Sequence, residues 1–105
     1  MDASGQLYTS GEWKVTPGKE AQFIETWQKF AEWTSANLPG AGEARLLQDP
    51  EHPDMFLSFG PWETLGHIRD WRSRPEFAAF VARARELCEE IRPRTLTVVA
   101  HIARR

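Results

Sequence analysis

Hydrophobic positions recur with two different periods along the first forty residues. Residues 7–15 are rich in aromatic and β-branched side chains and end just before a helix start, which predicts a strand. Residues 16–40 predict a helix, with Thr16 as its N-cap and Pro17 in its first position. Its apolar stripe repeats at spacings of three and four and consists of Phe23, Ile24, Trp27, Phe30, Ala31 and Thr34. Trp33 falls off this stripe and is expected to be partly exposed or to face a partner.

The middle of the chain predicts two strands joined by a turn. Residues 41–49 fit a strand, and the Pro-rich and polar segment 50–54 is typical of a turn. Residues 55–62 predict a central strand that Gly60-Pro61 ends, because proline cannot donate to the ladder of a sheet.

The last third of the chain predicts a broken helix and a final strand. Thr64 caps the first piece, and Ser73 with Pro75 restarts the helix. The apolar stripe of the restarted piece consists of Phe77, Phe80, Val81, Ala84, Leu87, Cys88 and Ile91. Pro93 ends this helix, and residues 94–103 predict the last strand.

This order of elements predicts an α+β fold of the ferredoxin-like βαββαβ type, an antiparallel sheet with helices on one face. We expect residues 1–6 to be an N-terminal tail and residues 7–103 to form one domain. The strand at 55–62 is apolar on both faces, so the face without helices needs a cover. A second copy of the chain would supply it, which predicts a homodimer formed sheet to sheet.

Composition excludes several partners. The chain has 105 residues and a net charge of −2 with the two signs interleaved, so we expect no nucleic-acid partner. The single Cys88 allows no internal disulfide, and the histidines have no metal-ligand spacing. No leader-like or membrane-spanning segment is evident, and we expect a cytoplasmic protein with no membrane partner.

The stretch "SFGPWETLGHIRDW" (58–71) carries the candidate chemistry. Trp62 and Trp71 either fill the junction of sheet and helix as large wedges or form a wall of a pocket. His67 lies in the first turn of a helix, where a neutral imidazole could deprotonate a phenol. The alternative for His67 is a solvent-facing position. Nucleophile elbows, phosphate loops and paired carboxylates are absent from the sequence.

Three segments resemble the antibiotic biosynthesis monooxygenase family, whose members form dimeric α+β barrels. They are "VTPGKEAQFIETW", "RLLQDPEHPDMFLSFGPWET" and "DWRSRPEFAAF", and the resemblance runs from about Leu7 to Ile102. The family includes cofactor-free quinone-forming oxygenases and haem-degrading oxygenases. In the quinone-forming pattern an Asn stands four residues before the tryptophan that matches Trp62, where this chain has Ser58. A serine can still donate one hydrogen bond to a phenolate or peroxy oxygen.

The haem-degrading pattern is mostly missing. Alignment places Gly11 at that pattern's Asn, Trp71 at its Trp and Val81 at its axial His, so only the tryptophan is retained. Without an imidazole at Val81 nothing ligates the iron, which argues against haem degradation.

The resemblance and the residues together predict a homodimeric, cofactor-independent monooxygenase that acts on an electron-rich aromatic or quinol. The expected pocket lies between sheet and helices, with Ser58 and His67 as its catalytic contacts and with four aromatic residues that bind the substrate, Trp62, Trp71, Phe23 and Trp27. No metal and no cofactor are expected. The alternative is a non-catalytic domain of the same fold that binds a small molecule or serves as an accessory unit.

Overall fold

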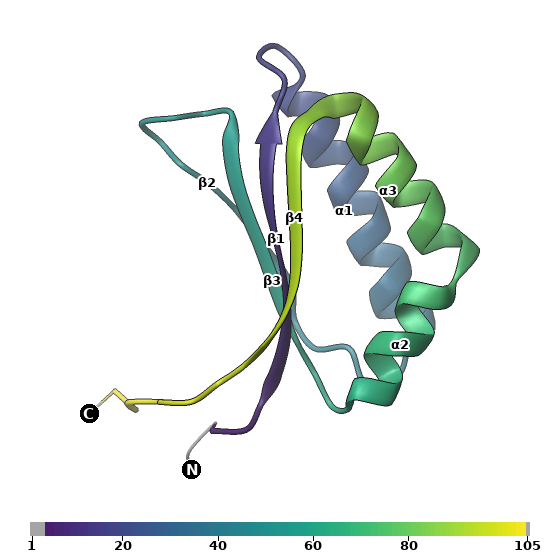
Figure 1. Ribbon diagram of the computed structural model, residues 1–105, viewed down its shortest axis with the longest axis vertical. Helices are drawn as coiled ribbons and strands as arrows, with labels where there is room; N and C mark the ends of the chain where they lie inside the picture. The colour runs from purple at the N-terminus through teal and green to yellow at the C-terminus, as the bar shows by residue number, and fades with distance from the viewer. Residues whose placement is uncertain (1–3, 105) are drawn as a thin grey trace.

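The computed structural model describes residues 4–104. The elements are β1 (Leu7–Val15), α1 (Glu20–Asn37), β2 (Arg45–Gln48), β3 (Met55–Trp62), α2 (Leu65–Ser73), α3 (Pro75–Leu87) and β4 (Cys88–Thr97). The strands form one antiparallel sheet in the order β2-β3-β1-β4. All three helices lie on one face of this sheet (Figure 1). The predicted α+β, ferredoxin-like fold with helices on one face is therefore confirmed.

Strand pairing fixes which side chains of the two central strands share a face. β1 and β3 run antiparallel with Thr9 opposite Gly60 and Gly11 opposite Ser58. Because side chains alternate across a strand, these four residues point to the same side. The alternate positions of β1 from Thr9 to Val15 are buried, and so are Phe56, Ser58, Gly60 and Trp62 of β3. This buried face is the one that the helices cover.

The core between sheet and helices has two parts. The larger cluster consists of Trp13, Val15, Phe23, Phe56, Phe80, Ala84 and Leu87. The smaller cluster consists of Leu38, Trp62 and Ile68, with the partly buried Trp33 packed against it. Trp33 is thus half-buried, as its position off the main stripe predicts. The two clusters lie toward opposite ends of β1 and β3, because Trp13 pairs with Phe56 and Leu7 pairs with Trp62.

The predicted start of the first helix was wrong. Thr16 and Pro17 lie in a turn, and α1 begins at Glu20 with Lys19 as its N-cap. Gly18 has a φ of 94°, a left-handed conformation that other residues rarely adopt, and it interrupts the helical path. The backbone N–H of Gly18, just before the helix, donates to Oε1 of Glu20 at 2.8 Å, so this donor has a side-chain acceptor.

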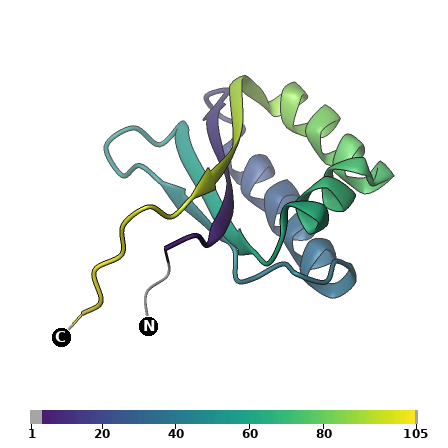
Figure 2. The ribbon, with the colours of Figure 1, turned by 60° about the horizontal axis from the view of Figure 1, so that its bottom comes forward.

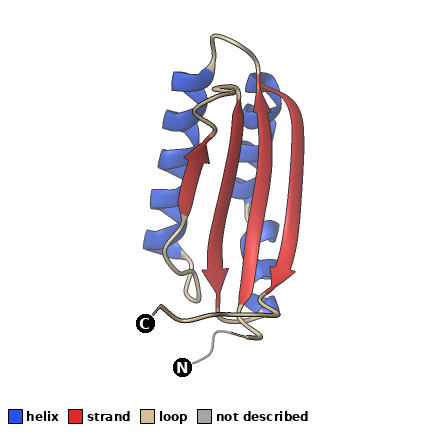
Figure 3. Ribbon diagram, turned by 90° about the vertical axis from the view of Figure 1, so that its left-hand side faces the viewer, coloured by secondary structure: helices blue, strands red, loops and turns tan. Residues whose placement is uncertain are grey.

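The predicted end of the last helix was also wrong. α3 ends at Leu87, and β4 begins at Cys88 and continues through Pro93. The strand order leaves β4 at the edge of the sheet, with β1 as its only neighbour (Figure 3). An edge strand tolerates a proline because one of its sides has no partner to hydrogen-bond. The strand also ends at Thr97, six residues before its predicted end at residue 103.

The remaining boundaries differ less. β2 is limited to Arg45–Gln48, although Ala41 forms an isolated bridge with Trp62. β3 has the predicted bounds, residues 55–62, but Gly60 and Pro61 lie within the strand and do not end it.

Of the expected N-terminal tail, residues 1–3 lie outside the described residues. Gln6 is tied to the sheet, because its Nε2 donates to the carbonyl of Trp62 at 2.7 Å. In the part of the chain that the structure describes, no helix has the length and hydropathy of a membrane span.

The second face of the sheet carries no helix. Figure 3 shows this face toward the viewer, with the helices behind it. Leu57 and Leu96 are 40% and 47% exposed here. Beyond β4 the chain extends away from the domain (Figure 2), and Val99 and Ile102 in that segment are 88% and 94% exposed.

Candidate functional site

A cavity of about 880 Å³ lies between the helices and the sheet. Six of the aromatic residues that line it are Trp13, Trp27, Phe30, Trp62, Trp71 and Phe77. Cavities of 300–1,000 Å³ lined mainly by apolar and aromatic side chains are typical of small-molecule sites. The cavity is therefore the candidate functional site of this chain.

Trp71 is the centre of the aromatic wall. Its ring centroid lies 5.0 Å from that of Trp62, 5.7 Å from that of Phe30 and 4.8 Å from that of Phe77. These partners come from β3, α1 and α3, so one side chain on α2 connects four elements. Offset and edge-to-face ring pairs at these separations are favourable beyond the area that they bury. The resulting wall suits a flat, apolar ligand.

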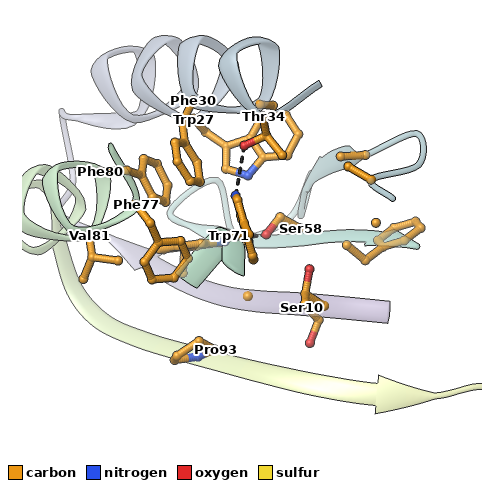
Figure 4. Close-up of a pocket in the computed structure, with 18 of the residues that line it drawn as sticks. Ser10, Trp27, Phe30, Thr34, Ser58, Trp71, Phe77, Phe80, Val81 and Pro93 are labelled. Carbon is orange, nitrogen blue, oxygen red and sulfur yellow. Dashed lines mark hydrogen bonds between the residues drawn. The ribbon is translucent and has the colours of Figure 1, made fainter. Parts of the chain in front are cut away.

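The buried hydroxyls of the cavity belong to three indole–hydroxyl pairs. Trp13 Nε1 donates to Ser58 Oγ, Trp62 Nε1 donates to Thr9 Oγ1, and Trp71 Nε1 donates to Thr34 Oγ1, each at 3.0 Å. All six residues line the cavity. The hydroxyl residues Ser58, Thr9 and Thr34 are only 7%, 8% and 9% exposed. Figure 4 shows Thr34 on α1 above Trp71 and Ser58 on a strand beside the Trp71 ring.

Two of these pairs follow one repeated pattern. Thr9, Gly11 and Trp13 on β1 have the same spacing as Ser58, Gly60 and Trp62 on β3. The two strands are antiparallel and centred on the pairing of Ser10 with Phe59, so a local twofold relates the two triplets. Each tryptophan donates to the hydroxyl of the other strand. The cavity floor is thus a symmetric unit built from the pattern Ser/Thr-x-Gly-x-Trp.

Two arginines lie at the rim of the cavity. Arg72 and Arg85 line it, and neither makes an ion pair with any residue in the range 4–104. Burial lowers the pKa of the Arg72 guanidinium from its usual value, because the charged form loses solvent. The charged lining of the cavity carries both signs, because it also includes Glu32, Glu43, Glu89 and Glu90.

The structure brings together four of the six predicted site residues. Ser58, Trp62, Trp71 and Trp27 all line the cavity. Phe23 does not line it, because its side chain is fully buried in the core at 0% exposure. Its ring lies 5.2 Å from that of Trp13 and 5.3 Å from that of Phe56.

His67 also lies apart from the cavity lining. Its backbone N–H donates to Thr64 Oγ1 at 3.1 Å, which confirms Thr64 as the cap of α2. Its Nδ1 lies 2.8 Å from the same oxygen. The ring covers Gly40, where an added Cβ would lie 2.5 Å from His67 Cγ. The His67 side chain is therefore held at the start of α2 and against the loop between α1 and β2, which contains Gly40.

The sequence interpretation missed Thr9, Trp13 and Thr34. The repeated Ser/Thr-x-Gly-x-Trp spacing on two strands was the signal for the first two residues. A threonine within the apolar stripe of α1 was the signal for Thr34, because a buried hydroxyl requires a polar partner.

No metal site is evident in the described range. His52 Nδ1 lies 3.3 Å from Asp49 Oδ2 in the exposed loop between β2 and β3. No group of three or more His, Cys, Asp or Glu within residues 4–104 has the arrangement to hold a metal ion.

Comparison with known proteins identifies the family. The family model for antibiotic biosynthesis monooxygenase matches residues 7–83. A comparison with curated proteins gives no match.

Solved structures match over nearly the whole chain. One is SnoaB, a cofactor-independent oxygenase from Streptomyces nogalater, with 17% identity over 96% of this chain and 100% of that chain and a TM-score of 0.85. Another is a conserved protein from Methanosarcina mazei Go1, with 14% identity over 90% and 94% of the two chains and a TM-score of 0.80. A third is PA3566 from Pseudomonas aeruginosa, with 16% identity over 93% and 98% and a TM-score of 0.77. At these identities the likeness shows a common fold.

Proposed function

The chain belongs to the antibiotic biosynthesis monooxygenase family, and from this premise we propose that it is a cofactor-independent monooxygenase acting on a flat, electron-rich aromatic or quinol. The observation that carries the proposal is the aromatic cavity of about 880 Å³ whose buried polar groups are hydroxyls. The likeness in fold to a cofactor-independent oxygenase supports it. We propose that Ser58 contacts the ring oxygen of the substrate on which negative charge develops, with Trp62 and Trp71 as aromatic walls of the same site.

The proposed reaction converts a ring CH₂ of an anthrone-type substrate to a carbonyl. Solvent at the cavity opening takes a proton from the carbon, and the carbanion reduces O₂ and forms a C–O bond, which gives a peroxide anion. This anion takes a proton back from solvent, and the O–O bond then breaks as the second hydrogen leaves the carbon as a proton, which gives C=O and one H₂O. The substrate supplies all of the electrons. The chain excludes water from the ring, holds it flat against Trp71 and stabilises developing negative charge on the ring oxygen through Ser58.

The test is oxygen uptake with a panel of anthrones and hydroquinones. We expect uptake above the protein-free rate with at least one member and one carbonyl formed per O₂ consumed. Ser58→Ala should lower kcat/KM by roughly 10²-fold, the usual scale for losing one oxyanion-stabilising donor. Ser73→Ala is the matched control, because that hydroxyl donates to the carbonyl of Asp70 outside the cavity lining. Uptake equal to the protein-free rate throughout the panel would refute the proposal.

A non-catalytic binding domain is the second candidate. It is favoured by the absence of any imidazole among the residues that line the cavity within the range 4–104. A ligand that binds tightly and is recovered unchanged under oxygen would support it. Turnover of the same ligand would exclude it.

We also propose that the chain forms a homodimer through the uncovered sheet face. That face has a shallow pocket of about 390 Å³ lined by Tyr8, Leu57, Phe59, Leu96 and neighbouring residues. Exposed apolar side chains on this scale favour burial against a second copy.

The dimer is tested by size in solution. We expect twice the 12.1 kDa of one chain. Leu57→Glu should shift the size toward the monomer. Leu65→Glu should not, because Leu65 lies on α2 and is similarly exposed, at 46%. A wild-type monomer at micromolar concentration contradicts the dimer.

A further inference from the structure

The three cavity hydroxyls accept hydrogen bonds but donate none to the protein. Each of Thr9, Thr34 and Ser58 accepts an indole N–H at 3.0 Å. Within residues 4–104, no acceptor receives the hydroxyl hydrogen of any of them. All three side chains are more than nine-tenths buried. Three buried O–H donors therefore remain available to whatever fills the cavity.

The indoles determine the direction in which each hydroxyl hydrogen points. A hydroxyl offers one donor and two acceptor positions, and it rotates to suit its partners. Once an indole N–H occupies a lone pair, the hydroxyl hydrogen points elsewhere. Tryptophan has no acceptor on its N–H, so the bond cannot be reversed. Each indole therefore turns the hydroxyl hydrogen away from itself and toward the cavity, while the oxygen keeps one free lone pair.

The donors approach from two sides. Thr9 and Ser58 occupy diagonal positions on β1 and β3, which places their backbones about 7–8 Å apart on the cavity floor. Thr34 comes from α1 on the opposite side (Figure 4). A flat molecule between the sheet and α1 would meet donors on both sides.

We propose that the cavity selects a flat aromatic ligand whose ring oxygens are acceptors without hydrogens, namely ketones or ionised phenols. The inference rests on the proposed function and deepens it, because it names the chemical form that the site takes. A neutral phenol adds one more O–H donor to a cavity that already has three buried donors without acceptors in residues 4–104. A ketone or phenolate satisfies them.

Trp13 is the positioning residue for this preference. It is 6% exposed and lies over Gly11, where an added Cβ would approach its ring atoms to 2.6–2.8 Å. The glycine thus leaves room for the indole to lie flat and reach Ser58. Replacement of the indole by a phenyl ring keeps an aromatic surface and removes the N–H. The Ser58 hydroxyl is then free to rotate, and its hydrogen is no longer held toward the cavity.

The test compares two probes of one outline, anthraquinone-2-sulfonate and anthracene-2-sulfonate, by quenching of tryptophan fluorescence. The quinone adds two acceptor oxygens, and the shared sulfonate cancels any effect of Arg72 and Arg85. We expect the wild type to bind the quinone at least 10-fold more tightly. Trp13→Phe should reduce this ratio about 3–10-fold, and Ser58→Ala should reduce it similarly, with the hydrocarbon affinity of each variant close to that of the wild type.

Two controls keep the result interpretable. Trp33→Phe changes an indole that does not line the cavity, and its ratio should equal that of the wild type. Circular dichroism checks that each variant folds. If Trp13→Phe does not fold, Ser58→Ala still tests the role of the same hydroxyl. Equal affinity of the two probes for the wild type, or an unchanged ratio in both variants, overturns the inference.

The binding ratio is independent of turnover. A quinone preference without oxygen uptake supports this inference and removes the proposed function. Oxygen uptake without a quinone preference does the reverse.

Discussion

Thr34→Val removes the acceptor of the Trp71 indole N–H and should destabilise the fold. The bond is 3.0 Å long and joins α1 to α2, and Thr34 is 9% exposed. Valine has nearly the same shape, so the change isolates the hydroxyl. A donor left without an acceptor in a buried setting costs about 1–3 kcal/mol. Trp71 is half-buried and faces a cavity that water can enter, so we expect about 1–2 kcal/mol, at the lower end of that range.

Urea unfolding at fixed protein concentration measures this loss, because a dimer would make the midpoint depend on concentration. A loss of about 1–2 kcal/mol corresponds to a fall in melting temperature of roughly 4–16 °C for a domain of this size. Thr26→Val is the matched control in the same helix, since its hydroxyl has no hydrogen bond within residues 4–104.

A double-mutant cycle with Trp71→Phe separates the hydrogen bond from ring packing. Removing both partners should cost less than the sum of the single changes, by about 1 kcal/mol. Additive losses would refute the reasoning. So would a loss for Thr34→Val within about 0.5 kcal/mol of that for Thr26→Val, the usual scatter for surface changes.

Three further predictions concern single side chains. Phe23→Ala should cost about 3–5 kcal/mol of unfolding free energy, because the ring is fully buried, and it should leave probe binding by the folded variant unchanged. Burial raises the pKa of the Cys88 thiol to about 11, so its reaction with a disulfide reagent at pH 8 should be at least about 10-fold slower in the folded chain than in urea, because the loss of thiolate outweighs its greater nucleophilicity. Gly40→Ala should lower the unfolding free energy more than Gly18→Ala in urea unfolding, although φ is positive at both positions. An added Cβ at Gly40 would lie 2.5 Å from the ring of His67, whereas at Gly18 it would meet nothing within 4 Å. In a His67→Ala background the two substitutions should cost the same.

The fold was predictable because local patterns and strand order agree. The apolar run at residues 55–62 and the spacing of three and four in α1 each depend on short-range sequence. Both segments form the predicted element, although Ile24 of the predicted α1 stripe is 38% exposed. The errors lie where a tertiary pairing decides the outcome. The apolar stripe of α3 continues in sequence through Cys88 and Ile91, but pairing of β4 with β1 takes these residues into the sheet. No local signal separates a helical stripe from an edge strand of the same composition.

The candidate site was predictable only in part, for a related reason. Trp62 and Trp71 stand out because large aromatic side chains are few and concentrated. The direction of His67 could not be predicted, because it depends on a hydroxyl three residues earlier and on a glycine in a different loop. Thr9 and Trp13 lie 45 to 53 residues from their partners in the chain, so their role follows only from the register of β1 against β3.

The indole–hydroxyl pairs connect the stability of the fold to the chemistry of the cavity. The same three N–H bonds that satisfy buried tryptophans also set the hydroxyls as donors. Two of these bonds lie within the sheet, where the register fixes them, and the third crosses between α1 and α2. Loss of any of these bonds leaves an indole N–H without its acceptor. Trp13 and Trp62 are more deeply buried than Trp71, so Ser58→Ala should lower stability at least as much as Thr34→Val. The same substitutions therefore affect both stability and ligand preference, and ligand binding by the folded variant separates the two effects.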